Sequence, residues 1–318
     1  MKSTAVVKFG GSSLSNSDKF IFVAHRIKSF KKKYKNVVAV LSAPADITDN
    51  LLKLSEKFIR EERALDMLLS SGENISISLM QMSLKKIGIK SIALNPYQAE
   101  IITTNKYSDA DIISLNQKRI MKLIKSGYVV ILPGFTGISK KLDITTLGRG
   151  GSDYTAVYVS DVLDADCYLL SDMAGVYSSN PAKIENAVKI KDISYTELFE
   201  IAKVDSEIRQ TKALEYAFKR NLSLYLGSTF NISTPTLIKN YPVNHKPVVK
   251  YISIKTDENR TKIIFIGENI YKRTDLIDEI KKFFDLKLNI KRNKIKLDFN
   301  RSLSSEDLNR IYKRFIFY

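Results

Sequence analysis

The chain has 318 residues, of which 44% are hydrophobic and 27% are charged. This is an ordinary globular composition, and the length suits one large domain or two modest ones. With a single cysteine, Cys167, no intrachain disulfide can form, so a disulfide scaffold is excluded and a reducing cytoplasm is expected. No run of about 18 apolar residues occurs, so we expect no membrane span, and the N-terminus does not look like a signal peptide.

The net charge is +17, from 51 basic and 34 acidic residues. A basic chain can bind nucleic acid, but these lysines are spread along the sequence and do not alternate with aromatic residues in one patch, so we expect no nucleic-acid partner. The two histidines, His25 and His245, lie far from each other and from the cysteine. Zinc and Cys/His chemistry are therefore not expected, which leaves Lys, Arg, Asp, Glu, Ser and the glycine backbone.

Apolar strands alternate with amphipathic helices through the first 230 residues or so. Strands are predicted at 4–9, 37–43, 91–96, 128–135, 167–172 and 222–227. Helices are predicted at 17–33, 49–60, from near Gly72 to 86, 113–126, 153–163, 194–202 and 208–219. Such an alternation predicts an α/β domain with a largely parallel sheet that is covered on both faces.

The composition changes at 231–247, a stretch with three prolines and no clear period, which marks a domain boundary. Beyond it, we predict strands at 248–254, 262–267 and 294–299 and helices at 274–284 and 304–314. These elements form a small α+β module. We therefore expect a larger domain over residues 1–235 and a smaller one over 246–318.

The first motif with chemical potential is KFGGSS, from Lys8 to Ser13, at the end of the first strand. Glycines at a strand end let backbone N–H groups approach an anion closely. A lysine just before them can place its ammonium on the same phosphate. The P-loop pattern GxxxxGK[ST] is absent, and a plain strand-to-helix turn is the alternative interpretation.

The second motif is TLGRGGSDYTA, over residues 146–156, where three glycines surround Arg149 and a helix follows. A helix N-terminus favours an anion, and an arginine can clamp a carboxylate with two parallel hydrogen bonds. Asp153 could cap the helix and still have a second role. A third segment, SDMAGVYSSNP over 171–181, offers hydroxyls, a carboxylate and an aromatic ring that suit an adenine or ribose. On its own it is a common strand-to-loop pattern.

The order of these motifs resembles that of the aspartate kinases in the amino-acid kinase superfamily. VAVLSAPADITDNLLKL (38–54), LLSSGENISISLM (68–80) and NPYQAEIIT (95–103) are similar to further segments of that family, so the resemblance covers about residues 4–202. It implies a three-layer αβα amino-acid-kinase domain with a largely parallel sheet. The C-terminal module resembles a single ACT-like domain, where aspartate kinases commonly have two.

The resemblance implies roles residue by residue. The catalytic residues would be Lys8, on the transferring phosphate, and Asp153, which organises the lysines. The substrate-binding residues would be Ser42, Thr48, Glu73 (on the ammonium), Phe135, Arg149 (on a carboxylate) and Ser152. The ATP-binding residues would be Lys8, Gly10, Gly11, Ser12, Ser171, Asp172, Tyr177, Lys183 and Lys212.

The activity that the resemblance implies is ATP-dependent phosphorylation of the β-carboxylate of L-aspartate, with Mg²⁺ carried mainly on the ATP oxygens. Such a reaction is a first step toward amino acids of the lysine, threonine and methionine type. Phosphoryl transfer needs positive charge and in-line placement more than covalent chemistry from the protein, which agrees with the residues available. The resemblance also implies a homodimer in the cytoplasm.

Several positions depart from the family pattern. Asn180-Pro181-Ala182 stands where the family has Asp-Pro-Arg, and Lys183 would replace the lost cation. In the segment DSEIRQT, over 205–211, Glu207 aligns with a family lysine, so that Lys212 becomes the fallback phosphate ligand. Asp46 replaces a glycine.

In the C-terminal module, Arg273-Thr274-Asp275 replaces the Pro-Gly turn of an effector loop. We therefore do not expect feedback inhibition by an amino acid, and dimerisation is the expected role of the module.

Two other interpretations stay open. One is a family relative that acts on a different carboxylate or phosphate acceptor, although the retained Glu73 and Arg149 favour an amino acid. The other is a regulatory protein that binds a nucleotide or an amino acid without turnover. Glu207 and the lost Asp-Pro-Arg favour this second alternative, and the retained Lys8 and Asp153 disfavour it.

Overall fold

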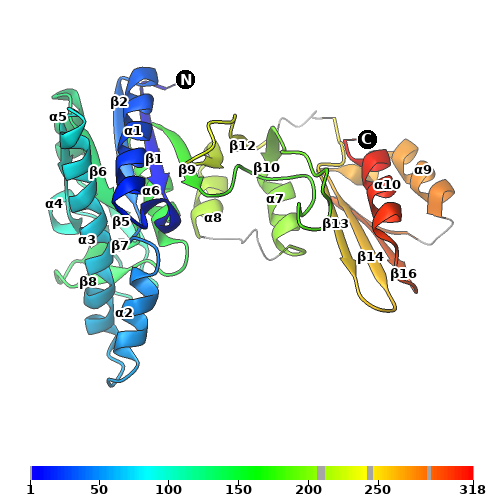
Figure 1. Ribbon diagram of the computed structural model, residues 1–318, viewed down its shortest axis with the longest axis horizontal. Coiled ribbons are helices and arrows are strands. Elements are labelled where there is room, and N and C mark those ends of the chain that lie inside the picture. Colours follow the sequence, from blue (N-terminus) through cyan, green and yellow to red (C-terminus); the bar gives the residue numbers. More distant parts are fainter. Residues whose placement is uncertain (1, 206–211, 242–245, 285–287, 318) are drawn as a thin grey trace. The chain divides into compact units, whose positions relative to one another are not determined.

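The computed structural model divides into two compact units (Figure 1). It describes residues 2–205, 212–241, 246–284 and 288–317. Unit 1 comprises Met1–Ala174 and Thr211–Pro235, and unit 2 comprises Gly175–Gln210 and Thr236–Tyr318. The units differ from the predicted domains in that residues 175–210 group with the C-terminal module. Within the described part of the chain, no helix is long and apolar enough to cross a membrane.

Unit 1 is built on a parallel sheet with the strand order β11-β9-β1-β2-β6-β3. Its strands are β1 (Thr4–Phe9), β2 (Asn36–Leu41), β3 (Ser91–Ala93), β6 (Val129–Pro133), β9 (Asp166–Ser171) and β11 (Leu224–Ser228). The central strands β1, β2 and β6 are almost continuously buried and rich in valine. Both features are typical of a parallel sheet covered on its two faces.

The helices of unit 1 surround this sheet, and some of them pack on its two faces (Figure 1). They are α1 (Ser17–Lys33), α2 (Ile47–Ser55), α3 (Glu62–Lys86), α4 (Pro96–Ala99), α5 (Gln117–Lys125), α6 (Gly151–Val162) and α8 (Lys212–Lys219), with a 3₁₀ turn, η1, at Gly11–Leu14. Helices α1 and α3 contact each other and the sheet, whereas α6 packs on β1 and β9 and against α8. The predicted three-layer arrangement is therefore present.

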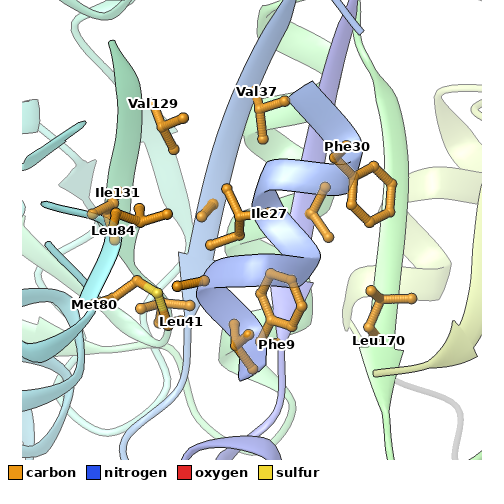
Figure 2. Close-up of a cluster of buried hydrophobic side chains, with 14 of the residues drawn as sticks. Phe9, Ile27, Phe30, Val37, Leu41, Met80, Leu84, Val129, Ile131 and Leu170 are labelled. Carbon is orange, nitrogen blue, oxygen red and sulfur yellow. The ribbon is translucent and has the colours of Figure 1, made fainter. Parts of the chain in front are cut away.

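Alternation along the strands decides which side chains meet which helices. Successive strand residues point to opposite faces, and Phe9, Leu41 and Ile131 share one buried cluster with Ile27 of α1 and Met80 of α3 (Figure 2). Their neighbours in sequence point to the α6 face. Lys8 is one of these, so its side chain leaves the sheet on the face opposite this apolar cluster.

Two helix predictions were wrong in their start. Helix α3 begins at Glu62, well before Gly72, because the Glu61 carboxylate accepts hydrogen bonds from the backbone N–H groups of Arg63 and Ala64 and caps the helix there. Gly72 lies inside the helix instead. A Cβ at Gly72 would lie 2.8 Å from the Cβ of Ala43, so glycine is needed for close packing and not for a helix start.

The second wrong start is that of the helix predicted at 113–126, which begins at Gln117 as α5. The preceding residues form strand β5 (Ile112–Ser114) of a four-stranded mixed sheet in the order β5-β4-β7-β8. Its other strands are β4 (Ile102–Thr103), β7 (Thr136–Ser139) and β8 (Ile144–Thr146). The helix predicted at 208–219 is described from Lys212 onward, and its first residues lie outside the described part.

Unit 2 contains the predicted α+β module. Its antiparallel sheet has the order β13-β14-β16-β15, and helices α9 and α10 bury Ile280 and Phe315 in one cluster with Phe265 of the sheet. The elements are β13 (Tyr251–Thr256), β14 (Thr261–Ile266), β15 (Asn289–Lys291), β16 (Lys294–Phe299), α9 (Thr274–Phe284) and α10 (Ser305–Phe315).

The remainder of unit 2 comprises the parallel pair β10 (Asp192–Ser194) and β12 (Thr236–Lys239), helix α7 (Tyr195–Ala202) and the 3₁₀ turn η2 (Ile270–Lys272). Helix α7 starts with the predicted capping box. The Ser194 hydroxyl accepts from the N–H of Glu197, and the Glu197 carboxylate accepts from the N–H of Ser194.

Candidate active site

The carboxyl ends of four parallel strands of unit 1 lie level with one another. The N–H of Gly10 donates to the carbonyl of Leu170 at 3.1 Å, that of Ser42 to Phe9 at 3.2 Å, and that of Gly134 to Leu41 at 2.8 Å. The loops after β1, β2, β6 and β9 therefore begin side by side. In α/β folds this edge of the sheet is where ligands bind.

A pocket of about 320 Å³ opens among the loops after β1, β2 and β6 and the start of α6. Nine of the predicted residues line it: Lys8, Gly11, Ser42, Thr48, Glu73, Phe135, Arg149, Ser152 and Asp153. These include both predicted catalytic residues and all six predicted substrate-binding residues. The fold therefore brings together in one cavity residues from five separate segments of the chain.

At one side of the pocket, Lys8 forms an ion pair with the first turn of α6. Its Nζ lies 2.7 Å from Oδ1 of Asp153, and the side chains are 12% and 32% exposed. Gly10 lies beside this ammonium, since a Cβ there would be 3.6 Å from Nζ. A largely buried ammonium that borders an open cavity attracts anions strongly, because the surrounding dielectric is low.

At the other side of the pocket, Glu73 is a buried carboxylate, 3% exposed. Its Oε1 accepts a hydrogen bond from the N–H of Ala43 at 3.1 Å, and its Oε2 has no hydrogen-bond partner among the described residues. Burial raises the pKa of this carboxyl to about 7, and the hydrogen bond from Ala43 partly opposes that shift. A buried carboxylate with one free oxygen is a suitable acceptor for an ammonium group.

The glycine-rich loop before α6 carries Arg149 to the rim of the pocket. Gly148 and Gly150 have φ values of +75° and +76°, a region that glycine enters without strain. Arg149 is exposed, and its side chain makes no hydrogen bond or ion pair with the described residues. Its guanidinium is thus available to an anionic ligand.

Two further backbone features shape the pocket. Gly134 lies against the start of α6, because a Cβ there would be 2.6 Å from the Cβ of Ser152. Asp46 has φ +67° at the N-cap of α2, and its side chain makes no capping hydrogen bond. The glycine that Asp46 replaces in the family pattern is therefore at a left-handed position, where a non-glycine residue is strained.

Four predicted ATP-binding residues at the ends of β1 and β9 do not line the pocket, namely Gly10, Ser12, Ser171 and Asp172. Ser12 follows Gly11, and its carbonyl accepts a hydrogen bond from Lys19 at 2.8 Å. Ser171 ends β9, and its Cβ lies 4.0 Å from the Cβ position at Gly10. Asp172 follows Ser171 and is exposed.

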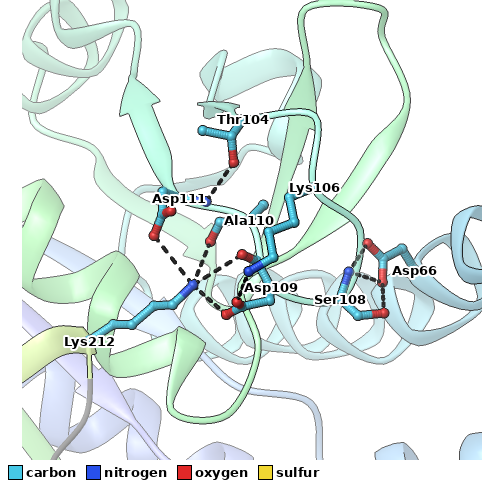
Figure 3. Close-up of polar contacts among 8 residues, drawn as sticks. All are labelled: Asp66, Thr104, Lys106, Ser108, Asp109, Ala110, Asp111 and Lys212. Atoms are coloured by element: carbon cyan, nitrogen blue, oxygen red, sulfur yellow. Dashed lines mark hydrogen bonds and ion pairs between the residues drawn. The ribbon is translucent and has the colours of Figure 1, made fainter.

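Lys212 does not line this pocket. Its Nζ contacts Oδ1 of Asp109, Oδ1 of Asp111 at 3.3 Å, and the carbonyls of Asp109 and Ala110 at 3.1 and 3.4 Å (Figure 3). Its ammonium is thus held by one loop of unit 1. Whether Lys212 also serves the nucleotide stays a prediction.

Two predicted nucleotide residues belong to unit 2. The backbone of Tyr177 forms an isolated antiparallel β-bridge with that of Lys189. The Nζ of Lys183 donates a hydrogen bond to the carbonyl of Ile254 at 3.1 Å. Their roles stay predictions, as does the role of Glu207, which lies outside the described residues.

Sequence reasoning did not identify every residue of the site. Asp49 lines the pocket from the first turn of α2, which begins two residues before the predicted start at residue 49. The predicted helix also placed Asp49 at its start, but no motif singled this residue out. Asp66 of α3 is fully buried beneath the glycine-rich loop. Within the described residues, no group of three or more His, Cys, Asp or Glu residues is arranged to hold a metal ion.

Comparisons with known proteins agree with this architecture. The model of the amino acid kinase family matches residues 3–228. The aspartokinase of Corynebacterium glutamicum is 36% identical over 270 residues, which are 82% of this chain and 63% of that relative. The aspartokinase of Geobacillus stearothermophilus is 34% identical over 265 residues, which are 82% of this chain and 65% of that relative. The chain thus spans less than two thirds of the length of these relatives.

Solved structures share the fold. The crystal structure of E. coli aspartokinase III in complex with aspartate and ADP has a TM-score of 0.73 and 18% identity, and it covers 97% of this chain and 98% of its own. Clostridium acetobutylicum aspartate kinase has a TM-score of 0.72 and 18% identity, with 98% and 100% covered. These matches confirm the predicted fold, and the extent of the family match shows that the chain belongs to the amino acid kinase family.

Proposed function

We propose that the protein transfers the γ-phosphoryl group of ATP to the β-carboxylate of L-aspartate, giving aspartyl phosphate and ADP. The observation that carries this proposal is that Lys8, Glu73 and Arg149 line a single pocket. The pocket thus contains an ammonium that can bind a phosphate, together with a carboxylate and a guanidinium that can bind the charged groups of an amino acid. The similarity to aspartokinases over 82% of the chain supports the same substrate.

In this proposal, the amino-acid end of the pocket recognises charge at two points. The free Oε2 of Glu73 accepts the substrate ammonium, and this contact compensates a carboxylate that is otherwise buried without a partner. The guanidinium of Arg149 binds the α-carboxylate with two hydrogen bonds. Four further residues form the walls, namely Ser42, Thr48, Phe135 and Ser152. The β-carboxylate is then directed toward Lys8.

At the phosphate end, Lys8 and the backbone of Gly10, Gly11 and Ser12 hold the γ-phosphate. An oxygen of the β-carboxylate attacks the γ-phosphorus while the bond from that phosphorus to the β-phosphate oxygen breaks, and no proton needs to move. Lys8 stabilises the charge on the transferring group. Asp153 keeps the ammonium in place through the 2.7 Å ion pair. We assign the remaining nucleotide contacts of unit 1 to Ser171 and Asp172.

Mg²⁺ would enter with the nucleotide. This ion is usually bound by one or two carboxylates together with substrate phosphates and water, and Asp153 offers a carboxylate at the phosphate end of the pocket. Bound there, Mg²⁺ would neutralise phosphate charge. We also propose a homodimer that involves the C-terminal module and a location in the cytoplasm, where the buried Cys167 would stay reduced.

The test is ADP release by the purified protein with Mg²⁺-ATP and a panel of amino acids, with hydroxylamine present to trap an acyl phosphate as a hydroxamate. We expect ADP release and hydroxamate formation with L-aspartate, and loss of both in Asp153→Ala. Turnover with a different carboxylate acceptor would replace aspartate in the proposal. ATP binding without turnover on any acceptor would overturn it in favour of a regulatory protein.

A further inference from the structure

Asp66, in the second turn of α3, is a fully buried carboxylate that joins loop 108–111 to Thr146, the last residue of β8. Figure 3 shows its contact with Ser108. It accepts hydrogen bonds from the N–H of Ser108 at 2.9 Å and from the Ser108 hydroxyl at 3.3 Å. It also accepts from the N–H of Thr146 at 2.8 Å and from the Thr146 hydroxyl at 2.7 Å. Four donors therefore converge on one side chain, which is the pattern that makes burial of a carboxylate tolerable.

Loop 108–111 and the end of β8 also contact each other directly. The N–H of Ala110 donates to the carbonyl of Thr146 at 2.9 Å. A Cβ at Gly148 would lie 3.1 Å from Oδ1 of Asp109 and 3.2 Å from the carbonyl of Ser108. Thr146 is thus fixed through its N–H, its hydroxyl and its carbonyl, and the glycine-rich loop starts from a residue with little freedom.

Arg149 lies in the glycine-rich loop that follows Thr146. Since its own side chain has no hydrogen bond or ion pair with the described residues, its place at the rim of the pocket depends on the backbone that carries it. The opposite side of loop 108–111 is held by Lys212, through Asp109 and Asp111 (Figure 3). Loop 108–111 is therefore held by Asp66 at Ser108 and by Lys212 at Asp109 and Asp111.

We infer that Asp66 is a positioning residue for substrate binding, which holds the Thr146–Gly150 backbone so that Arg149 meets the substrate carboxylate. This inference rests on the proposed role of Arg149. An asparagine at position 66 keeps the shape of the side chain but presents an NH₂ group where a carboxylate oxygen now accepts. The two hydroxyls can turn to accept from that NH₂ group, so the four contacts become hydrogen bonds to a neutral amide. Such bonds are weaker than those to a carboxylate, and the Thr146–Gly150 backbone would open more readily.

The first arm of the test measures the loop without any turnover. Hydrogen exchange of the wild-type protein and of Asp66→Asn would be followed at the backbone amides of Ser108 and Thr146, together with trypsin cleavage after Arg149. We expect faster exchange at both amides and about tenfold faster cleavage in the variant, because opening of the loop controls both. Unchanged exchange and cleavage would overturn the inference.

The second arm is a double-mutant cycle with Arg149→Ala in the proposed aspartate kinase assay. If Asp66 acts through Arg149, then Asp66→Asn raises the aspartate KM about tenfold in the wild-type background and less than about twofold in the Arg149→Ala background. The KM for ATP should change less than about twofold in both backgrounds. Equal effects in the two backgrounds, or an equal effect on the ATP KM, would mean a general structural role and would overturn the inference.

Asp161→Asn is the matched control. Asp161 is also a largely buried acceptor, at 14% exposed, and it accepts from the Tyr216 hydroxyl at 2.7 Å and from Nε of Arg220 at 2.8 Å, away from the pocket. The Asp161→Asn substitution should lower the stability of the protein, but it should change neither the aspartate KM nor the rate of trypsin cleavage after Arg149. Should Asp66→Asn fold poorly, Thr146→Val removes only the hydroxyl donor and should give a smaller change in the same direction. Absence of aspartate turnover in the wild-type protein would refute the proposed function, whereas the exchange and cleavage arm would still decide on Asp66.

Discussion

The ammonium of Lys8 lies 2.7 Å from a carboxylate oxygen of Asp153, although one residue belongs to a central strand and the other to the first turn of a helix. An acidic residue in a first turn is favourable to the helix in its own right. Asp153 therefore contributes to the start of α6 and at the same time fixes the cation that borders the pocket. The fold and the site depend on the same contact.

The first prediction concerns Lys8. Lys8→Met should lower kcat by about a hundredfold or more, because the transferring phosphoryl group loses its nearest cation. Lys32→Met, on the exposed side of α1, is the control and should leave kcat unchanged. Steady-state ADP release measures both. Near-normal turnover of Lys8→Met would remove Lys8 from the reaction.

The second prediction concerns the pH dependence that Glu73 causes. The pKa of its carboxyl is raised to about 7, mainly by burial, and only the ionised form can accept an ammonium. The kcat/KM for aspartate should therefore rise with pH up to about 7 and then level off, and Glu73→Gln should lose this dependence together with most of the affinity. A profile that is flat between pH 6 and 8 would contradict the assignment.

The same shift predicts an effect of Glu73 on stability. A carboxyl whose pKa is higher in the folded than in the unfolded state binds more protons when folded, so its contribution to stability is lost as pH rises toward about 7. Glu73→Gln should therefore unfold at a higher temperature than the wild-type protein at pH 8, and the difference should shrink at pH 5. Thermal unfolding of both proteins without ligand measures this difference.

The third prediction separates substrate binding from turnover. Arg149→Ala should raise the aspartate KM by about tenfold or more, with little change in the ATP KM, because a charged hydrogen-bond partner of the substrate is lost. Arg149→Lys should recover only part of the affinity, since an ammonium cannot bind a carboxylate with two parallel bonds. An unchanged aspartate KM would exclude Arg149 as the clamp.

The fourth prediction concerns backbone strain at Asp46. Because this residue has φ +67°, Asp46→Gly should stabilise the protein by up to about 1 kcal/mol, and Asp46→Ala should destabilise it by a similar amount. Urea unfolding of the wild-type protein, Asp46→Gly and Asp46→Ala gives the order of their free energies of unfolding. If alanine proved as stable as glycine at this position, the left-handed conformation would not be present in solution.

The fifth prediction concerns Lys212, whose ammonium is held by Asp109 and Asp111. From this geometry, Lys212→Met should loosen loop 108–111 and alter the ATP KM by less than about twofold. A much larger rise in the ATP KM would show that Lys212 leaves these carboxylates and contacts the nucleotide, as the family resemblance implies. Hydrogen exchange at the Ala110 amide reports on the loop in the same variant.

The sequence was sufficient to predict the parallel sheet, because long apolar strands and amphipathic helices carry strong periodic signals. It was not sufficient for the small sheet of unit 1. Strand β4 has only Ile102 and Thr103, which is too short for any alternation to show. The start of α3 was wrongly predicted near Gly72, because a glycine in a sequence usually indicates the end of a helix. Only its close packing against Ala43 explains a glycine inside this helix.

The site was predicted largely through motif order, and the pocket contains all six residues expected on the substrate side. Asp66 could not be predicted in this way. Its partners, Ser108 in a loop and Thr146 at the end of β8, are distant from it in sequence, and no local pattern connects them with α3. Lys212 shows the same difficulty, because a lysine at a helix start does not indicate whether a phosphate or a pair of aspartates will hold it.

The close approach of Gly72 to Ala43 bears on how this pocket could change its specificity. Helix α3 packs against Ala43, in the loop after β2, only because position 72 has no side chain. The adjacent Glu73 accepts a hydrogen bond from the backbone N–H of the same Ala43. The pocket is therefore closely packed at Glu73, whereas Asp46, Thr48 and Arg149 line it from a loop or from the start of a helix. In the proposed function, changes at these three positions would admit acceptors of different length, but every acceptor would still have to place its ammonium group against Glu73.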